Sequence, residues 1–171
     1  MTFKSLYDRI LLRLVLNKEM VRIISLDICP ENTRCILIES DLSDSLKSKL
    51  MSLGWLPGRE IKVIRRAPFG DPTIYLVDST EISLRQDESK MIKVEPLYPA
   101  SLSVVPKGTY VVLNFTAGKF FSDKVRNLGI EIGKEIQVLS DPSNCKISIM
   151  TNGGEFLIGH GMGQKILVKV R

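Results

Sequence analysis

Two stretches of this 171-residue chain are approximate copies of each other, and this repeat limits the fold more than any single motif does. Residues 50–64 read LMSLGWLPGREIKVI and residues 125–139 read VRNLGIEIGKEIQVL, which aligns Gly54 with Gly129. Apolar and proline positions on both sides correspond at nearly the same offset. A repeat of this length indicates two copies of one small domain, because solenoid repeats are much shorter.

Within each copy, short apolar segments separated by glycine, proline and polar turns predict a mainly β unit. About five strands and one short helix are the composition of a small curled β-barrel. The strands are expected at 34–38, 60–64, 74–77, 81–84 and 91–94, and at 110–113, 135–139, 146–150, 155–158 and 165–170.

Each predicted helix has residues suited to its two ends. Asp41 or Ser43 can cap the first helix and Ser122 the second, because their side-chain oxygens accept unpaired backbone amides. Gly54 and Gly129 are expected to end these helices in the left-handed conformation. A tight turn then follows in both copies, with Gly58 and Gly133 at the position where a type II turn requires a positive φ.

The expected domain limits are 20–97 and 98–171, joined across the proline-containing segment 95–101. Residues 1–19 belong to neither copy. Their apolar residues recur at helical spacing, which predicts a short amphipathic helix. Such a helix either packs on a barrel or a partner, which we favour, or lies weakly on a membrane surface.

Composition excludes several classes of protein. No apolar run approaches the roughly 20 residues that cross a bilayer. Three cysteines, an odd number without metal-ligand spacing, favour reduced thiols in a cytoplasm. The second copy is the more basic, with nine Lys or Arg residues against five Asp or Glu. A mild excess and 6% aromatic residues do not predict nucleic-acid binding, which needs a clustered basic stripe.

The sequence contains no enzyme motif. His160 is its only histidine, and the glycine-rich segment 159–163 lacks the lysine of a phosphate-binding loop, so it is expected to form a turn. His160 and Cys145, with Met162, are weak candidates for a soft metal ion. We therefore predict no catalytic residues and no certain cofactor, with weak binding of a divalent transition metal left open.

Three motifs in the first copy resemble the FeoA family. They are Leu53-Gly54-x-x-Pro57-Gly58-x-x-Ile61-x-Val63, Pro68-x-Gly70-Asp71-Pro72 and Ile82-x-Leu84-Arg85-x-x-Glu88. The resemblance implies two tandem SH3-like barrels, the second diverged. It implies a cytoplasmic accessory protein of ferrous iron uptake that binds the cytoplasmic part of the FeoB transporter. Contact with the inner membrane would then be peripheral, through the transporter, and self-association is left open.

The partner-binding residues expected in and beside the Gly-Asp-Pro loop are Phe69, Gly70, Asp71, Pro72 and Arg85. Two interpretations of this loop remain open. It is either a structural turn, with Asp71 accepting backbone amides, or an exposed loop that presents Phe69 to a partner. Arg85 either pairs with a carboxylate such as Asp71 or belongs to the docking face.

The second copy differs at this loop, since it has Asp141-Pro142-Ser143-Asn144-Cys145 there. The alternative function is a metal-responsive regulatory or nucleic-acid-binding SH3-like module. A metal-dependent repressor also needs a helix-turn-helix segment, and residues 1–19 are too short to supply one.

Overall fold

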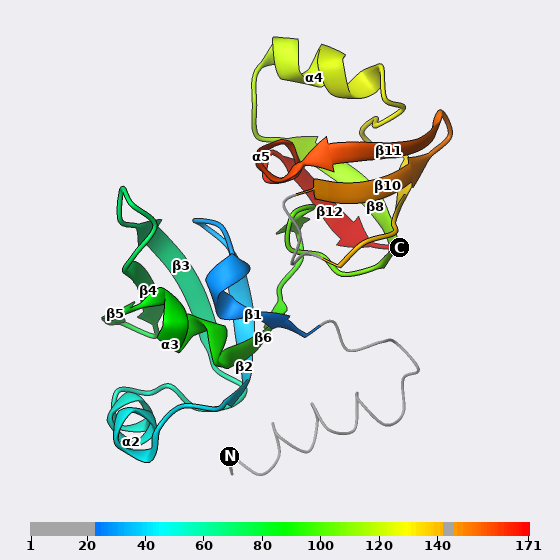
Figure 1. The fold of residues 1–171 in the computed structure, drawn as a ribbon. Helices are drawn as coiled ribbons and strands as arrows, with labels where there is room; N and C mark the ends of the chain where they lie inside the picture. The colour runs from blue at the N-terminus through cyan, green and yellow to red at the C-terminus, as the bar shows by residue number, and fades with distance from the viewer. Residues whose placement is uncertain (1–22, 142–145) are drawn as a thin grey trace, which may run out of the picture. The chain divides into compact units, whose positions relative to one another are not determined.

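The computed structural model describes residues 23–141 and 146–171, and the chain forms two compact units. The first unit ends at Pro96 and the second begins at Leu97 (Figure 1). The amphipathic helix predicted for residues 1–19 lies outside the described residues. Each unit is mainly β-sheet, as predicted, and the two are considered separately below.

The first unit is a six-stranded antiparallel sheet with the strand order β1-β6-β2-β3-β4-β5. Its helices lie in the connections between strands, and one of them joins the two central strands (Figure 1). The elements are β1 (Ile24–Ser25), the 3-10 helix η1 (Leu26–Ile28), β2 (Arg34–Ser40), α2 (Asp44–Ser52), β3 (Glu60–Arg66), β4 (Thr73–Val77), β5 (Thr80–Leu84), α3 (Gln86–Lys90) and β6 (Ile92–Pro96).

The second unit is also a six-stranded antiparallel sheet, with the order β11-β10-β9-β8-β12-β7. Its elements are β7 (Ala100–Ser101), β8 (Gly108–Phe115), α4 (Lys119–Arg126), β9 (Glu135–Val138), β10 (Lys146–Thr151), β11 (Gly154–Gly159), α5 (His160–Gly163) and β12 (Ile166–Val170). Both sheets thus have one more strand than the five predicted.

Matching hydrogen bonds at the ends of α2 and α4 show that the sequence repeat is a structural repeat. The Gly54 amide donates to Met51 O at 3.1 Å and the Gly129 amide to Arg126 O at 2.8 Å. Both glycines have a positive φ, +93° and +74°. The predicted left-handed helix ends are therefore confirmed in both copies.

The turns after these helices also agree. Gly58 and Gly133 have φ values of +87° and +83°, in the region where glycine avoids the clash of a side chain. In each copy the amide of the next residue donates back across the turn, from Arg59 to Leu56 O at 3.0 Å and from Lys134 to Glu131 O at 3.1 Å. The glycine in each turn has the conformation that the spacing predicted.

The interior of each unit consists of alternate strand residues, as expected when one face of a sheet is buried. The first core is built around Tyr75 and Trp55, whose rings meet edge to face at a centroid distance of 6.0 Å. In the second core the buried Tyr110 stacks on Tyr98 at 6.1 Å, and its hydroxyl donates to Pro106 O at 2.8 Å. The two copies thus share a backbone arrangement but fill their cores differently.

Two sequence predictions about the second copy were wrong. Ser122 does not cap α4, because the helix begins earlier, with Gly118 in extended conformation at its N-cap and the Ser122 amide donating to Gly118 O. The glycine-rich segment 159–163 is not a simple turn, since residues 160–163 form the short helix α5. A Cβ on Gly163 would lie 2.4 Å from Ile147 Cδ1, so this glycine allows close packing.

Arg66, at the end of β3, holds η1 against the first sheet. Its Nη2 donates to Asp27 O at 2.7 Å and to Cys29 O at 3.0 Å, and its backbone amide donates to Glu31 Oε1 at 2.8 Å. A charged donor therefore satisfies two carbonyls of a segment with few backbone partners of its own.

We expect Arg66→Met to lower the free energy of unfolding of the first unit by about 1–2 kcal/mol, because two partly buried carbonyls lose a charged donor. Hydrogen exchange of the amides near η1 would measure the loss. The neighbouring exposed Arg65→Met is the matched control and should change it little. Equal exchange in both variants would contradict this role of Arg66.

Candidate functional site

The loop of residues 67–72, called the Phe69 loop below, connects β3 to β4 and projects past the ends of these strands (Figure 1). It is closed by two backbone hydrogen bonds, from Ala67 N to Pro72 O at 3.0 Å and from Gly70 N to Ala67 O at 2.7 Å. Gly70 has a φ of +89°, which a residue with a side chain adopts only with strain. The Phe69 side chain at its tip is 100% exposed.

Asp71 attaches this loop to the start of α3. Its Oδ1 accepts a hydrogen bond from the Gln86 amide at 2.8 Å, so the carboxylate satisfies a donor at the end of a short helix. Pro72, whose peptide bond with Asp71 is cis, directly precedes β4. The structural interpretation of Asp71 as a backbone acceptor is therefore correct, and it also fixes where Phe69 is presented.

Arg85 lies beside this loop because β4 pairs with both β3 and β5. Thr73 is opposite Arg66 on one side and opposite Leu84 on the other, which places the end of β5 next to the loop. Arg85 is the N-cap of α3, where its amide donates to Glu88 Oε2 at 2.7 Å. Within the described residues it forms no ion pair with Asp71, and its side chain is exposed.

The five predicted partner-binding residues thus lie together at one end of the first sheet. They comprise an exposed aromatic ring, an exposed guanidinium group and a loop held by hydrogen bonds at both ends. The arrangement suits surface recognition, because the ring and the guanidinium group are both exposed to solvent. An exposed aromatic on a well-held loop is the kind of residue that anchors a protein interface.

Two further residues take part in this site, Gln86 through its main-chain amide and Glu88 through its side-chain carboxylate, and neither was predicted as a site residue. Glu88 was visible only as part of a motif, and its spacing of three residues from Arg85 is that of a helix-capping carboxylate. The identity of residue 86 gave no indication of this role in the sequence, because Gln86 takes part through its main-chain amide.

The structure describes only one of the two predicted metal candidates. His160 is the first residue of α5, and Cys145 lies outside the described residues. Residues 23–141 and 146–171 contain no group of three or more His, Cys, Asp or Glu side chains able to hold a metal ion. Metal binding by His160 and Cys145 stays a prediction.

Cys29 and Cys35 are buried free thiols in the first core, consistent with their interpretation as small apolar residues. The adjacent Cys35 thiol and burial raise the pKa of the Cys29 thiol well above its usual value. The neutral thiol is therefore the stable form in this core. Among the described helices, none is long and apolar enough to cross a membrane.

Two small antiparallel β units joined in tandem, each with a short helix after its first long strand, define a protein of paired SH3-like domains. The family model for the FeoA domain matches residues 24–96 and, a second time, residues 101–170. The chain belongs to the FeoA family, which is associated with ferrous iron transport and consists of SH3-like domains. The predicted resemblance and the mainly β, SH3-like fold are confirmed.

Three solved structures illustrate this similarity. Iron(II) transport protein A from Clostridium thermocellum is 31% identical, with a TM-score of 0.72 over 86% of this chain and 88% of that protein. The FeoA-like protein from Clostridium acetobutylicum is 31% identical over 46% of this chain and 91% of its own, with a TM-score of 0.41. The FeoA protein from Chlorobium tepidum is 26% identical over 44% and 72%, with a TM-score of 0.43.

Proposed function

We propose that this protein is a non-enzymatic accessory protein of ferrous iron uptake that binds the cytoplasmic part of the FeoB transporter through the Phe69 loop. Membership of the FeoA family supports the link to ferrous iron transport. The observation that carries the docking proposal is the complete exposure of Phe69 on an anchored loop. The protein would then be cytoplasmic and reach the inner membrane through the transporter.

The loop is suited to this role because it is held in place before a partner arrives. Asp71 and the two backbone hydrogen bonds at its base restrict its conformations. A partner that covers Phe69 then gains apolar burial without paying the full entropy of ordering a flexible segment. Arg85 adds a planar charged donor beside the ring, and arginine is enriched at interface centres.

The first unit is the one that we assign to the transporter. The second copy lacks the Gly-Asp-Pro element that shapes the Phe69 loop, as its sequence at residues 141–145 shows. The two copies would therefore not bind two identical sites on one partner, and the second is free to have a different role.

The test is titration calorimetry of the full chain against the soluble nucleotide-binding domain of FeoB, with and without a GTP analogue. We expect Phe69→Ala to weaken binding at least about tenfold, as truncation of an interface hot spot does. Asp71→Ala should weaken it less, because it loosens the loop without removing the ring.

Phe120→Ala is the matched control, since Phe120 is the other strongly exposed phenylalanine among residues 23–141 and 146–171 and lies in the second unit. It should leave this affinity unchanged. The proposal fails if the wild-type protein does not bind in any nucleotide state, or if Phe69→Ala binds as tightly as Phe120→Ala.

A further inference from the structure

A cluster at the start of α4 in the second unit has no part in the function proposed above. We call it the α4 corner, and it consists of Lys119, Phe120, Lys124 and Lys165. Phe120 is 87% exposed, whereas the next residue, Phe121, packs edge to face on Phe115 at a centroid distance of 6.0 Å. Phe121 thus serves the core, and the ring of Phe120 has no comparable structural role.

Two of the lysines lie on the same helix as this ring, and the third lies beside the next ring, that of Phe121. Lys119 precedes Phe120, and Lys124 follows it at the i+4 position, on the same side of the helix. Lys165 lies next to them, because its Nζ is 5.7 Å from the ring centroid of Phe121 and its carbonyl accepts the Thr116 amide at 2.9 Å. None of the three lysines has an ion-pair partner in the described part of the chain.

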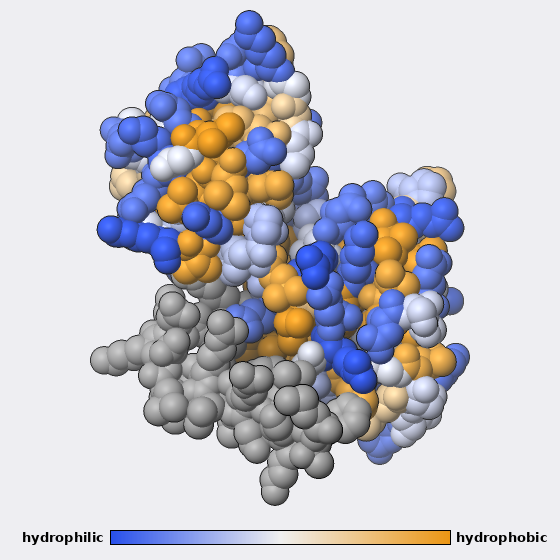
Figure 2. Space-filling view, turned by 180° about the vertical axis from the view of Figure 1, so that it is seen from behind, coloured by the Kyte–Doolittle hydropathy of each residue, from blue (hydrophilic) through white to orange (hydrophobic). Residues whose placement is uncertain are grey.

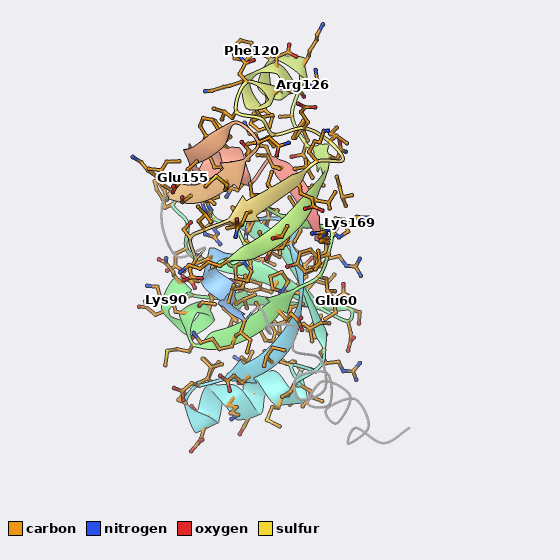
Figure 3. All side chains as sticks on the ribbon, turned by 90° about the vertical axis from the view of Figure 1, so that its right-hand side faces the viewer. Glu60, Lys90, Phe120, Arg126, Glu155 and Lys169 are labelled. Atoms are coloured by element: carbon orange, nitrogen blue, oxygen red, sulfur yellow. The ribbon has the colours of Figure 1, made fainter. Side chains whose placement is uncertain are left out.

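Acidic groups near the corner do not cancel this charge. Asp123, on α4 itself, pairs with Arg126 at 3.4 Å, and this pair is neutral as a unit. Glu131 lies one turn beyond the other end of the helix and is exposed. Figure 3 shows Phe120 and Arg126 on α4, with both side chains extending away from the sheet of their unit. The corner is therefore a basic surface with one exposed apolar ring.

The first unit provides an internal reference for this corner. The Asp41 amide donates to Met91 O at 2.9 Å, as the Thr116 amide does to Lys165 O, so Met91 and Lys165 are equivalent. Alignment of the helix ends at Gly54 and Gly129 sets the other equivalences, which are Asp44 with Lys119, Ser45 with Phe120 and Lys49 with Lys124.

The two copies therefore carry different surfaces on the same backbone. The first copy has one acid, one lysine, a serine and a methionine at these places, and so no net charge. The second has three lysines and a phenylalanine. Because the backbone is shared, the fold does not require the basic, aromatic version.

We propose that the α4 corner binds the surface of an anionic lipid bilayer. Each lysine close to such a surface gains electrostatic energy, and an exposed aromatic ring can enter the interface between headgroups and acyl chains. Lysine side chains suit this position because their methylene stems lie along apolar surface while the ammonium group stays in water.

A bilayer fits the corner better than a folded acidic protein does. A protein partner must offer a pocket for a single protruding ring, whereas a lipid interface accepts one without a preformed cavity. Figure 2 shows hydrophobic residues reaching the surface of both units among hydrophilic ones, so an exposed apolar residue is not by itself distinctive. What distinguishes the α4 corner is that its exposed ring is combined with three lysines that have no ion-pair partner in the described chain. This combination favours an anionic lipid surface as the partner.

The experiment is co-sedimentation of the full chain with vesicles of zwitterionic phosphatidylcholine and with vesicles that also contain anionic phosphatidylglycerol. We expect binding only to the anionic vesicles, and less binding as sodium chloride is added. A variant carrying the residues of the first copy, Lys119→Asp, Phe120→Ser and Lys165→Met, should bind at least about tenfold more weakly.

The matched control makes the same three types of substitution at other exposed positions, Lys146→Asp, Phe69→Ser and Lys169→Met. It changes the net charge equally and should keep most of the binding. The lipid proposal is overturned if anionic vesicles do not bind the wild-type protein or if both variants lose binding equally. Full binding by Phe120→Ser alone would also overturn it. No transporter is present, so the result is independent of the function proposed above.

Discussion

Tyr75→Ala should unfold the first unit while the second stays folded. Tyr75 is fully buried, and removing such a ring leaves a cavity as well as less apolar burial. Substitutions of this kind cost about 3–5 kcal/mol of the free energy of unfolding. A unit of this size has only a few kcal/mol of stability in total, so the loss is comparable to the whole.

Fluorescence makes this result easy to follow, because Trp55 is the only tryptophan in the chain. It is buried with its ring 6.0 Å from that of Tyr75, so its emission in a urea titration reports on the first unit alone. We expect the unfolding midpoint to fall strongly or the transition to disappear, with strand signal from the second unit persisting in circular dichroism.

Tyr75→Phe is the matched control. The Tyr75 hydroxyl is buried and has no hydrogen-bond partner of good geometry among the described residues. Burial raises the pKa of Tyr75, and the nearby hydroxyls of Ser89 and Thr73 oppose this in part. Removing an unpartnered hydroxyl should leave stability unchanged or slightly higher. A large loss in Tyr75→Phe would show that the hydroxyl, not the ring, stabilises this core.

Gly129→Ala should destabilise the second unit by roughly 2–4 kcal/mol, more than Gly54→Ala does in the first. Both glycines end a helix with a positive φ, where an alanine costs about 1–2 kcal/mol. Only at Gly129 does the new Cβ also collide, at 2.8 Å from Thr151 Oγ1 and 3.3 Å from Gly153 N. The Thr151 hydroxyl donates to Leu128 O at 2.8 Å and accepts from Gly153 N, so the collision disrupts that network.

At Gly54 the nearest atom to the added Cβ is Asp78 Oδ2 at 3.6 Å, an ordinary contact. Gly54→Ala therefore measures the backbone cost alone, and the difference between the two variants measures the collision. Hydrogen exchange of peptides from each unit would give the two losses separately. Equal losses would mean that Thr151 moves aside without cost.

The sequence predicted the long, regular elements well because their signals are local. Alternating apolar residues mark β2, β3, β8 and β10, and a glycine that needs a positive φ marks the end of each helix. It missed β1 and β7, which are two-residue strands that exist only because β6 and β12 pair with them. It also misjudged Ser122, since an N-cap position depends on where the chain leaves the preceding strand.

The residues of the proposed docking loop could be named from the sequence, but their geometry could not. Phe69, Gly70 and Asp71 stood out from their order in the chain, yet whether the loop is structural or exposed could not be read there. The structure shows that both apply, because Asp71 binds the Gln86 amide while Phe69 stays in solvent. The sequence could not decide the role of Arg85 either. Its pairing with Asp71 was chemically reasonable, but this ion pair is absent among the described contacts.

By itself, the sequence determined that the chain is a duplicated small β unit, because the repeat is visible in the order of the residues, and strand alternation and turn glycines are local signals. Its motifs also resembled the FeoA family, which the family model then showed. The tertiary structure decided what each copy exposes. Residues from distant parts of the chain, such as Lys165 and Phe121, come together only after the strands pair, and the chemistry of the surface depends on that contact. The internal comparison of α2 with α4 then shows two different surfaces on one backbone.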